Sequence, residues 1–138
     1  MPADLTAWLR ATIEGDKAKA EAVADGSAPW VGRWEAEGNV ALRTYNGHVL
    51  AHLRGIPFKA GLLDHIALHD PRDTIARCEA ELELLDLHKP GEYGECVTCH
   101  VGAQSCGCCG WGDFPCDTVQ LLARGYRHRP GFKPSWLD

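Results

Sequence analysis

Six of the seven cysteines in this chain of 138 residues lie between Cys96 and Cys116, where little else is available to hold a fold. Residues 90–112 contain six glycines and only four large apolar side chains. Fixing the backbone of each residue costs about 1–2 kcal/mol of entropy, which the burial of so few side chains does not offset. The stretch is therefore either disordered or held by something other than packing, and the cysteines point to a bound metal ion.

The cysteine spacing allows two sets of four metal ligands. Two C-x2-C pairs are present, and each can direct two thiolates at one ion, as tetrahedral zinc sites require. The other set uses a histidine that ends one predicted helix and a cysteine that begins the next. We prefer this set because it joins two rigid elements, and His100 is a further candidate ligand. The first set is Cys96, Cys99, Cys106 and Cys109, and the second is His88, Cys96, Cys99 and Cys116.

Zinc is the predicted cofactor, in a structural role with every coordination position filled by protein. Zinc binding supplies about 10–16 kcal/mol in small zinc modules, which is enough to order a glycine-rich loop. An iron–sulfur cluster is the alternative, since it also takes four cysteine ligands. The remaining interpretation is that the clustered cysteines are unpaired or redox-active thiols. A redox or iron–sulfur switch would use Cys106, Cys108 and Cys109. Cys78 lies on the apolar stripe of a predicted helix, and we expect it to be a buried core residue.

Apolar spacing predicts helices at the beginning and in the middle of the chain. Leu5, Leu9 and Ile13 recur at helical intervals, and the helix is expected to end near Gly26. Residues 58–89 are predicted to form a helix pair bent at Pro71, since proline breaks a continuous helix and Asp70 can cap a new one.

Residues 30–54 are predicted to form a three-stranded antiparallel meander. Apolar and polar side chains alternate on both sides of Asn46-Gly47, as they do in half-buried strands. The Asn-Gly pair favours a two-residue type I′ turn, in which both residues need a positive φ. Such a small sheet needs a helix against its apolar face.

The C-terminal part is predicted to contain a short helix capped by Asp117 and ended by Gly125. We expect the aromatic tail after it to run extended over the body, with Tyr126, Phe132 and Trp136 as anchors. The fold class is therefore α+β: an N-terminal helix, the meander, the bent helix pair, a metal-stapled loop, the short helix and the tail. We expect a single domain over residues 1–138, with residues 90–116 as a metal-binding insert.

The charge balance excludes a general attraction to nucleic acid or anionic lipid. Nineteen acidic residues against 14 basic ones give a formal net charge of −5. Basic side chains gather near aromatic rings in the tail, where they can contact phosphate, but we favour a solvated tail or one that pairs with the acidic body. These residues are Arg124, Arg127, Arg129 and Lys133.

The chain is expected in the cytoplasm. Its first residues, MPADLTAWLRATIEGDK, show no secretion leader, and thiols stay reduced in the cytoplasm. No run approaches the ~18 apolar residues of a membrane helix, so we expect no membrane partner.

His65 and His69 are spaced so that both project from one helical face, a spacing that can bind zinc. The intervening Ile66 stands where the H-E-x-x-H metalloprotease motif carries its general base, so the hydrolase chemistry is missing. We therefore favour a structural role, in capping or core hydrogen bonding beside Asp70-Pro71. No complete catalytic constellation is visible elsewhere, and we do not expect an enzyme.

Three stretches are familiar in combination: DHIALHDPRDTIARCEAELELLDLHKP, the C-x2-C pair followed by FPCDTVQLLARGY, and HRPGFKPSW. Together they resemble a family of small uncharacterised proteins from actinobacteria and their phages. The resemblance implies a shared layout outside the 90–112 insert, and it implies no activity. The tail departs from the family pattern, because Arg129 separates His128 from the proline that follows it directly there.

The function predicted from the sequence is that of a non-enzymatic, zinc-stabilised binding or adaptor protein with a protein partner. The resemblance extends this to a phage-encoded factor that acts on a host protein. Two alternatives stay open. One is a redox or iron–sulfur switch, and the other is a nucleic-acid-binding zinc module that uses the basic tail.

Overall fold

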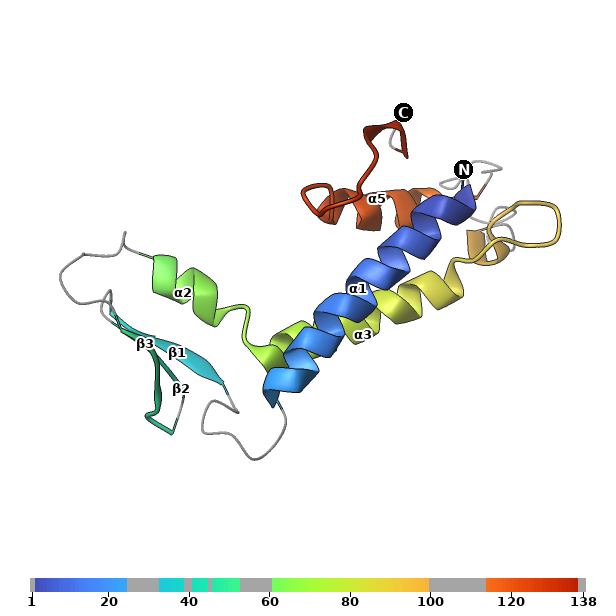
Figure 1. Ribbon diagram of the computed structural model, residues 1–138. Helices are drawn as coiled ribbons and strands as arrows, with labels where there is room; N and C mark the ends of the chain where they lie inside the picture. Colours follow the sequence, from blue (N-terminus) through green and yellow to red (C-terminus); the bar gives the residue numbers. More distant parts are fainter. Residues whose placement is uncertain are drawn as a thin grey trace. The chain divides into compact units, whose positions relative to one another are not determined.

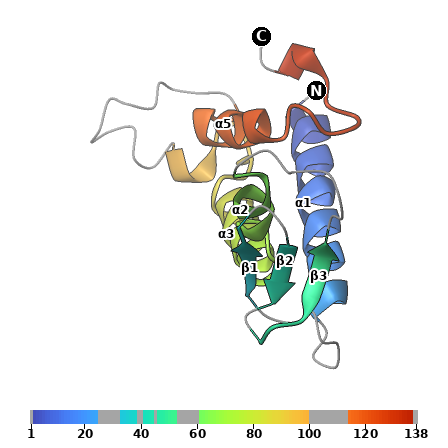
Figure 2. The same cartoon turned by 90° about the vertical axis from the view of Figure 1, so that its left-hand side faces the viewer.

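The computed structural model describes residues 2–24, 33–38, 41–44, 46–52, 61–99 and 114–136. It confirms the α+β class, with helices and a three-stranded antiparallel sheet (Figure 1 and Figure 2). The chain divides into two compact units, one made of Met1–Gly15 with Glu79–Asp138 and the other of Asp16–Cys78. The expected single domain stays a prediction.

The helices begin and end close to where the sequence places them. They are α1 (Pro2–Ala24), α2 (Leu62–Ala67), α3 (Pro71–Leu87) and α5 (Asp117–Gly125), with a short 3-10 helix, η1, at Pro134–Trp136. The predicted cap of α3 is confirmed, since the backbone N–H of Asp73 donates to Asp70 Oδ1 over 2.9 Å. Among the described residues, no helix is long and apolar enough to span a membrane.

The core of the first unit is built from one face each of α1 and α5, with Leu85 of α3. Side chains at helical spacing on α1 and α5 are fully buried, as an amphipathic helix requires. Two polar contacts connect the helices: Arg10 Nη2 donates to Asp86 Oδ1 over 2.6 Å, and the Tyr126 hydroxyl donates to Glu81. Within the first unit, the buried residues of the two helices are Leu5, Leu9, Ile13, Val119 and Ala123.

The aromatic tail does not run extended as predicted. Backbone hydrogen bonds from Arg129 to Tyr126 and from Phe132 to Arg129 fold it into turns, and η1 follows. Its rings nevertheless anchor it, because Phe132 and Trp136 lie 5.6 Å and 5.2 Å from the ring of Trp8 between centroids. The sequence has no local sign of this cluster, because Trp8 lies more than 120 positions from the two rings that it contacts.

The second unit contains the predicted meander, in the order β1-β2-β3, with α2 beside it (Figure 2). The strands are β1 (Trp34–Glu37), β2 (Ala41–Thr44) and β3 (Val49–His52), each antiparallel to its neighbour. β2 carries the buried side chains Ala41 and Leu42, and α2 contributes Leu63. Cys78 is fully buried, as predicted from its place on the helical stripe.

The turn between β2 and β3 differs from the predicted type I′ turn. Among the described residues only glycines have a positive φ, so Gly47 has one (90°) and Asn46 does not. The loop is one residue longer, since the backbone N–H of Thr44 donates to the His48 carbonyl over 2.8 Å. A three-residue loop with glycine in the left-handed position is the next commonest hairpin form.

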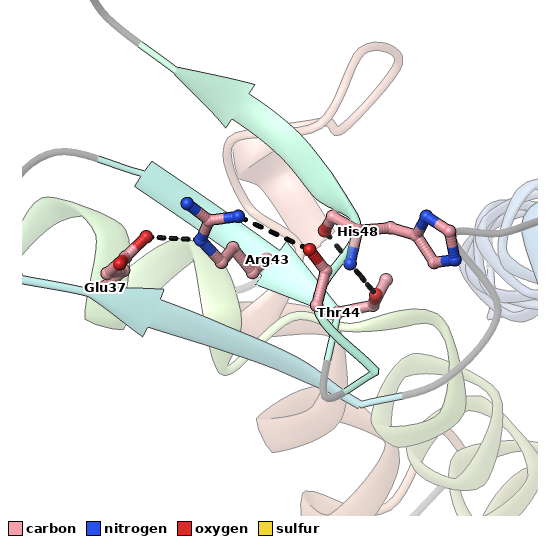
Figure 3. Close-up of polar contacts among 5 residues, drawn as sticks. Glu37, Arg43, Thr44 and His48 are labelled. Atoms are coloured by element: carbon pink, nitrogen blue, oxygen red, sulfur yellow. Dashed lines mark hydrogen bonds and ion pairs between the residues drawn. The ribbon is translucent and has the colours of Figure 1, made fainter.

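Side chains reinforce this hairpin (Figure 3). Thr44 is buried, and its Oγ1 accepts the backbone N–H of His48 over 3.1 Å. Arg43 pairs with Glu37 on the neighbouring strand and donates to the Gly47 carbonyl. Figure 3 shows the His48 ring pointing away from these contacts.

Candidate metal centre

Four side chains from three separate segments converge in the first unit. Their ligand atoms, one nitrogen and three sulfurs, all lie within 4.8 Å of one another. Cys96 and Cys116 are buried, and the other two residues are half-buried. The four residues are His88, Cys96, Cys99 and Cys116, the second set of ligands that the sequence suggests.

The distances within the cluster match those around a single tetrahedral ion. His88 Nδ1 lies 3.5 Å from the sulfur of Cys96, 3.6 Å from that of Cys99 and 3.4 Å from that of Cys116. A tetrahedron with Zn–S of about 2.3 Å and Zn–N of about 2.0–2.1 Å separates sulfur from nitrogen by about 3.6 Å. The three sulfurs therefore surround the imidazole nitrogen at the spacing that one bound ion would impose.

His88 is fixed by the end of α3. Its backbone N–H donates to the Leu84 carbonyl over 2.9 Å, so the residue continues the last turn of the helix. The hydroxyl of Thr98 donates to the Leu87 carbonyl next to it. The helix end and the cysteine turn are thus held together by protein contacts as well as by the ligands.

A tight turn carries the first two cysteines. Gly91 N–H donates to the Glu95 carbonyl over 2.6 Å, and Gly94 at its corner has a φ of 85°, which favours glycine. Residues 97–99 are helical, so the chain curls back and brings Cys99 to the same point as Cys96. A C-x2-C pair needs such a reversal, because both thiolates must face one ion.

Cys116 stands directly before α5, and the predicted cap at Asp117 is wrong by one residue. The helix begins at Asp117, and Cys116 takes the N-cap position with no side-chain capping bond. A cap residue has extended backbone, here φ −69° and ψ 167°. Gln120, the predicted partner of Asp117 in a capping box, instead donates from its side chain to the Pro115 carbonyl over 2.9 Å.

The protein environment of Cys96 favours its thiolate. Burial raises the pKa of the Cys96 thiol, but hydrogen bonds from the backbone amides of Cys99 and Thr98 and contacts with the other two thiols outweigh it, so its pKa lies below the ordinary value. The Cys99 thiol has the opposite shift, because burial and then the neighbouring sulfurs raise its pKa. Several thiolates cannot share this space without a compensating cation, which is the role that a metal ion plays.

The structure does not describe the other candidate ligands. Cys106, Cys109, Cys108 and His100 lie outside the described residues. Within the described part of the chain, Cys78, Cys96, Cys99 and Cys116 form no disulfide bond. That the convergent four bind a metal stays a prediction, which their geometry supports.

The basic side chains of the tail are exposed, and one of them makes the predicted contact with the body. Lys133 pairs with Asp4 of α1 and lies 5.2 Å from the ring centre of Trp136. Arg127 donates to His128 over 3.1 Å. Arg124 and Arg129 are also exposed.

Comparison with known proteins places this architecture in a family. No curated protein and no solved structure matches the chain. A protein-family model matches residues 2–138, which include both units and all four clustered ligands. The chain belongs to the family described as a family of unknown function (DUF6221).

Proposed function

We propose that this protein binds one zinc ion in a closed Cys3His site and serves as a non-enzymatic adaptor for another protein. The convergence of four ligand atoms within 4.8 Å carries the proposal. Three thiolates and one imidazole are a donor set typical of structural zinc. Because the protein fills all four positions, the ion has no place for a water or a substrate, and its role is to stabilise the fold.

The same geometry favours zinc over an iron–sulfur cluster. A cluster of two or four irons takes thiolates that are spread around the whole cluster. Ligand atoms that lie within 4.8 Å of one another surround a single ion instead. The presence of a histidine among the four ligands also favours zinc, since the common iron–sulfur clusters are held by cysteine alone.

The adaptor role is supported by apolar side chains that the first unit leaves exposed. Tyr93 on the cysteine turn is 90% exposed, Leu87 at the end of α3 is 58% exposed and Leu121 on α5 is 61% exposed. A contiguous patch of exposed apolar side chains is typical of a protein-binding surface, and we infer that these three residues contribute to one. The phage origin and the host target rest on the family resemblance alone, and the cytoplasmic location rests on the reduced cysteines.

Metal analysis of the purified chain, combined with its visible spectrum, tests the zinc site. We expect one zinc per chain and a colourless protein. A brown protein that contains iron would contradict the proposal.

Partner capture tests the adaptor role separately. We expect a protein retained by the wild type to be lost from a Leu87→Ser/Tyr93→Ser variant that still holds its zinc. Val49→Ser on β3 is a matched control, since Val49 is likewise an exposed apolar residue. Equal capture by all three chains would contradict a role for these side chains.

A further inference from the structure

The second unit contains a pair of exposed histidines whose rings have no hydrogen-bond partner among the described residues. His65 lies in α2 and His69 lies two residues beyond its end, and both are exposed. The predicted capping role belongs to Asp70, which accepts the N–H of Asp73. In the part of the chain that the structure describes, neither ring makes a hydrogen bond, and the two rings contact each other. Their ring nitrogens are therefore open to an external ligand.

The two rings are held on the same side of the chain. The turn that begins in α2 continues past its end, because Leu68 N–H donates to the Asp64 carbonyl and His69 N–H donates to the Ile66 carbonyl. The ring centroids consequently lie 4.9 Å apart, with their planes at 79°. This arrangement brings two imidazoles close without stacking them face to face.

That separation matches two imidazoles bound to one metal ion. A metal–nitrogen bond of about 2.0–2.1 Å places the ion about 3.2 Å from each ring centre. Coordination angles of about 90–109° then separate the two ring centres by about 4.5–5.2 Å. The observed 4.9 Å lies inside this range.

We propose that His65 and His69 form a second metal site, a two-histidine chelate for a divalent transition cation such as Ni²⁺, Cu²⁺ or Zn²⁺. Imidazole nitrogen is a preferred donor for these ions. Among the described residues, the one cluster of three or more ligating side chains is that around His88, so no third protein ligand joins this pair. Water fills the other positions, and the ion exchanges readily. This site is independent of the proposed Cys3His site.

Calorimetric titration of Ni²⁺ into the zinc-loaded full chain tests the chelate. Both rings must bind together, so we expect His65→Ala and His69→Ala each to weaken this binding at least 10-fold. The double variant should bind Ni²⁺ no more weakly than either single variant does. His52→Ala, at an exposed histidine on β3, should leave the affinity unchanged. Thiols elsewhere in the chain are the same in every variant, so differences between variants report the pair alone.

Twofold losses of Ni²⁺ affinity that add in the double variant would show that the two histidines bind independently, and would overturn the proposal. Equal affinities for all variants would overturn it as well. Nuclear magnetic resonance of the imidazole protons provides a second measurement on the unaltered protein. We expect sub-stoichiometric Ni²⁺ to broaden the signals of His65 and His69 together and before those of His48 and His52. Broadening of all histidines in parallel would contradict a chelate.

Discussion

His88 Nδ1 lies 3.4 Å from the sulfur of Cys116, although 28 positions of sequence separate the two residues. One residue follows the last turn of α3 and the other precedes the first turn of α5, so this contact ties two helices across a glycine-rich connection. A bound ion would stabilise the whole first unit through these two helices, in addition to ordering the loop.

Removing one ligand should weaken zinc binding and also make α5 less ordered. Loss of a residue that only hydrogen-bonds to a metal ligand already weakens metal binding about 10–100-fold. We therefore expect loss of a ligand itself, in Cys116→Ser, to weaken zinc binding more than about 100-fold. Amide hydrogen exchange of α5 should accelerate, because its first turn loses its anchor. Cys78→Ala is the matched control: its cysteine is buried but lies outside the cluster, so the variant should keep one zinc. Retention of zinc by Cys116→Ser would rule this residue out as a ligand.

Gly131 is predicted to be essential for docking of the tail. Its φ is 85°, and a Cβ added there would lie 2.9 Å from Trp8 Nε1. The left-handed conformation alone costs other residues about 1–2 kcal/mol, so we expect Gly131→Ala to lower the free energy of unfolding by about 1–3 kcal/mol. Denaturant unfolding followed by tryptophan fluorescence measures it. Gly125→Ala, which has open space around its Cβ, should be close to neutral, and equal losses at both glycines would contradict this account.

The hydrogen bond from the Tyr126 hydroxyl to Glu81 joins the end of α5 to α3. A hydrogen bond to a charged group contributes about 1.5–3 kcal/mol to folding stability. We therefore expect Tyr126→Phe to lower the free energy of unfolding by up to that amount. A double-mutant cycle with Glu81→Ala isolates the contact from the packing of the ring. The cycle should give a coupling energy that differs from zero, and strictly additive losses would mean that the two groups do not interact in solution.

Asp70 should stabilise α3 as its cap. Replacing a capping residue by alanine costs about 0.5–2 kcal/mol, whereas asparagine preserves the capping oxygen. We therefore expect Asp70→Ala to be clearly less stable than Asp70→Asn in chemical denaturation. If both variants lose the same stability, the negative charge rather than the cap is what the fold requires.

Local signals predicted most of the fold. The Asp70-Pro71 pair marks the beginning of α3, and the glycine in Asn46-Gly47 marks the hairpin, because both depend only on neighbouring residues. The turn type was wrong, since the buried hydroxyl of Thr44 bonds to His48 and closes a longer loop. The helical spacing of Leu5 and Leu9 likewise identified the buried face of α1.

Contacts between residues far apart in the sequence were harder to predict. The packing of Trp8 against Phe132 and Trp136 leaves no periodic pattern in the sequence, and the extended tail was a wrong prediction for that reason. For the metal site, the C-x2-C pair identified Cys96 and Cys99, and the predicted helix ends identified His88 and Cys116. That the four ligand atoms lie within 4.8 Å of one another is visible only in the fold. The exposure of His65 and His69 also depends on how α2 packs, which their spacing does not determine.

X-ray absorption spectroscopy at the zinc edge of the purified full chain tests the central claim most directly, because it reports the atoms bound to the metal. The account predicts one zinc per chain, with three sulfurs at about 2.3 Å and one nitrogen at about 2.0–2.1 Å. A zinc bound by four sulfurs would remove His88 from the site. A chain that is fully folded without any metal would contradict the account altogether.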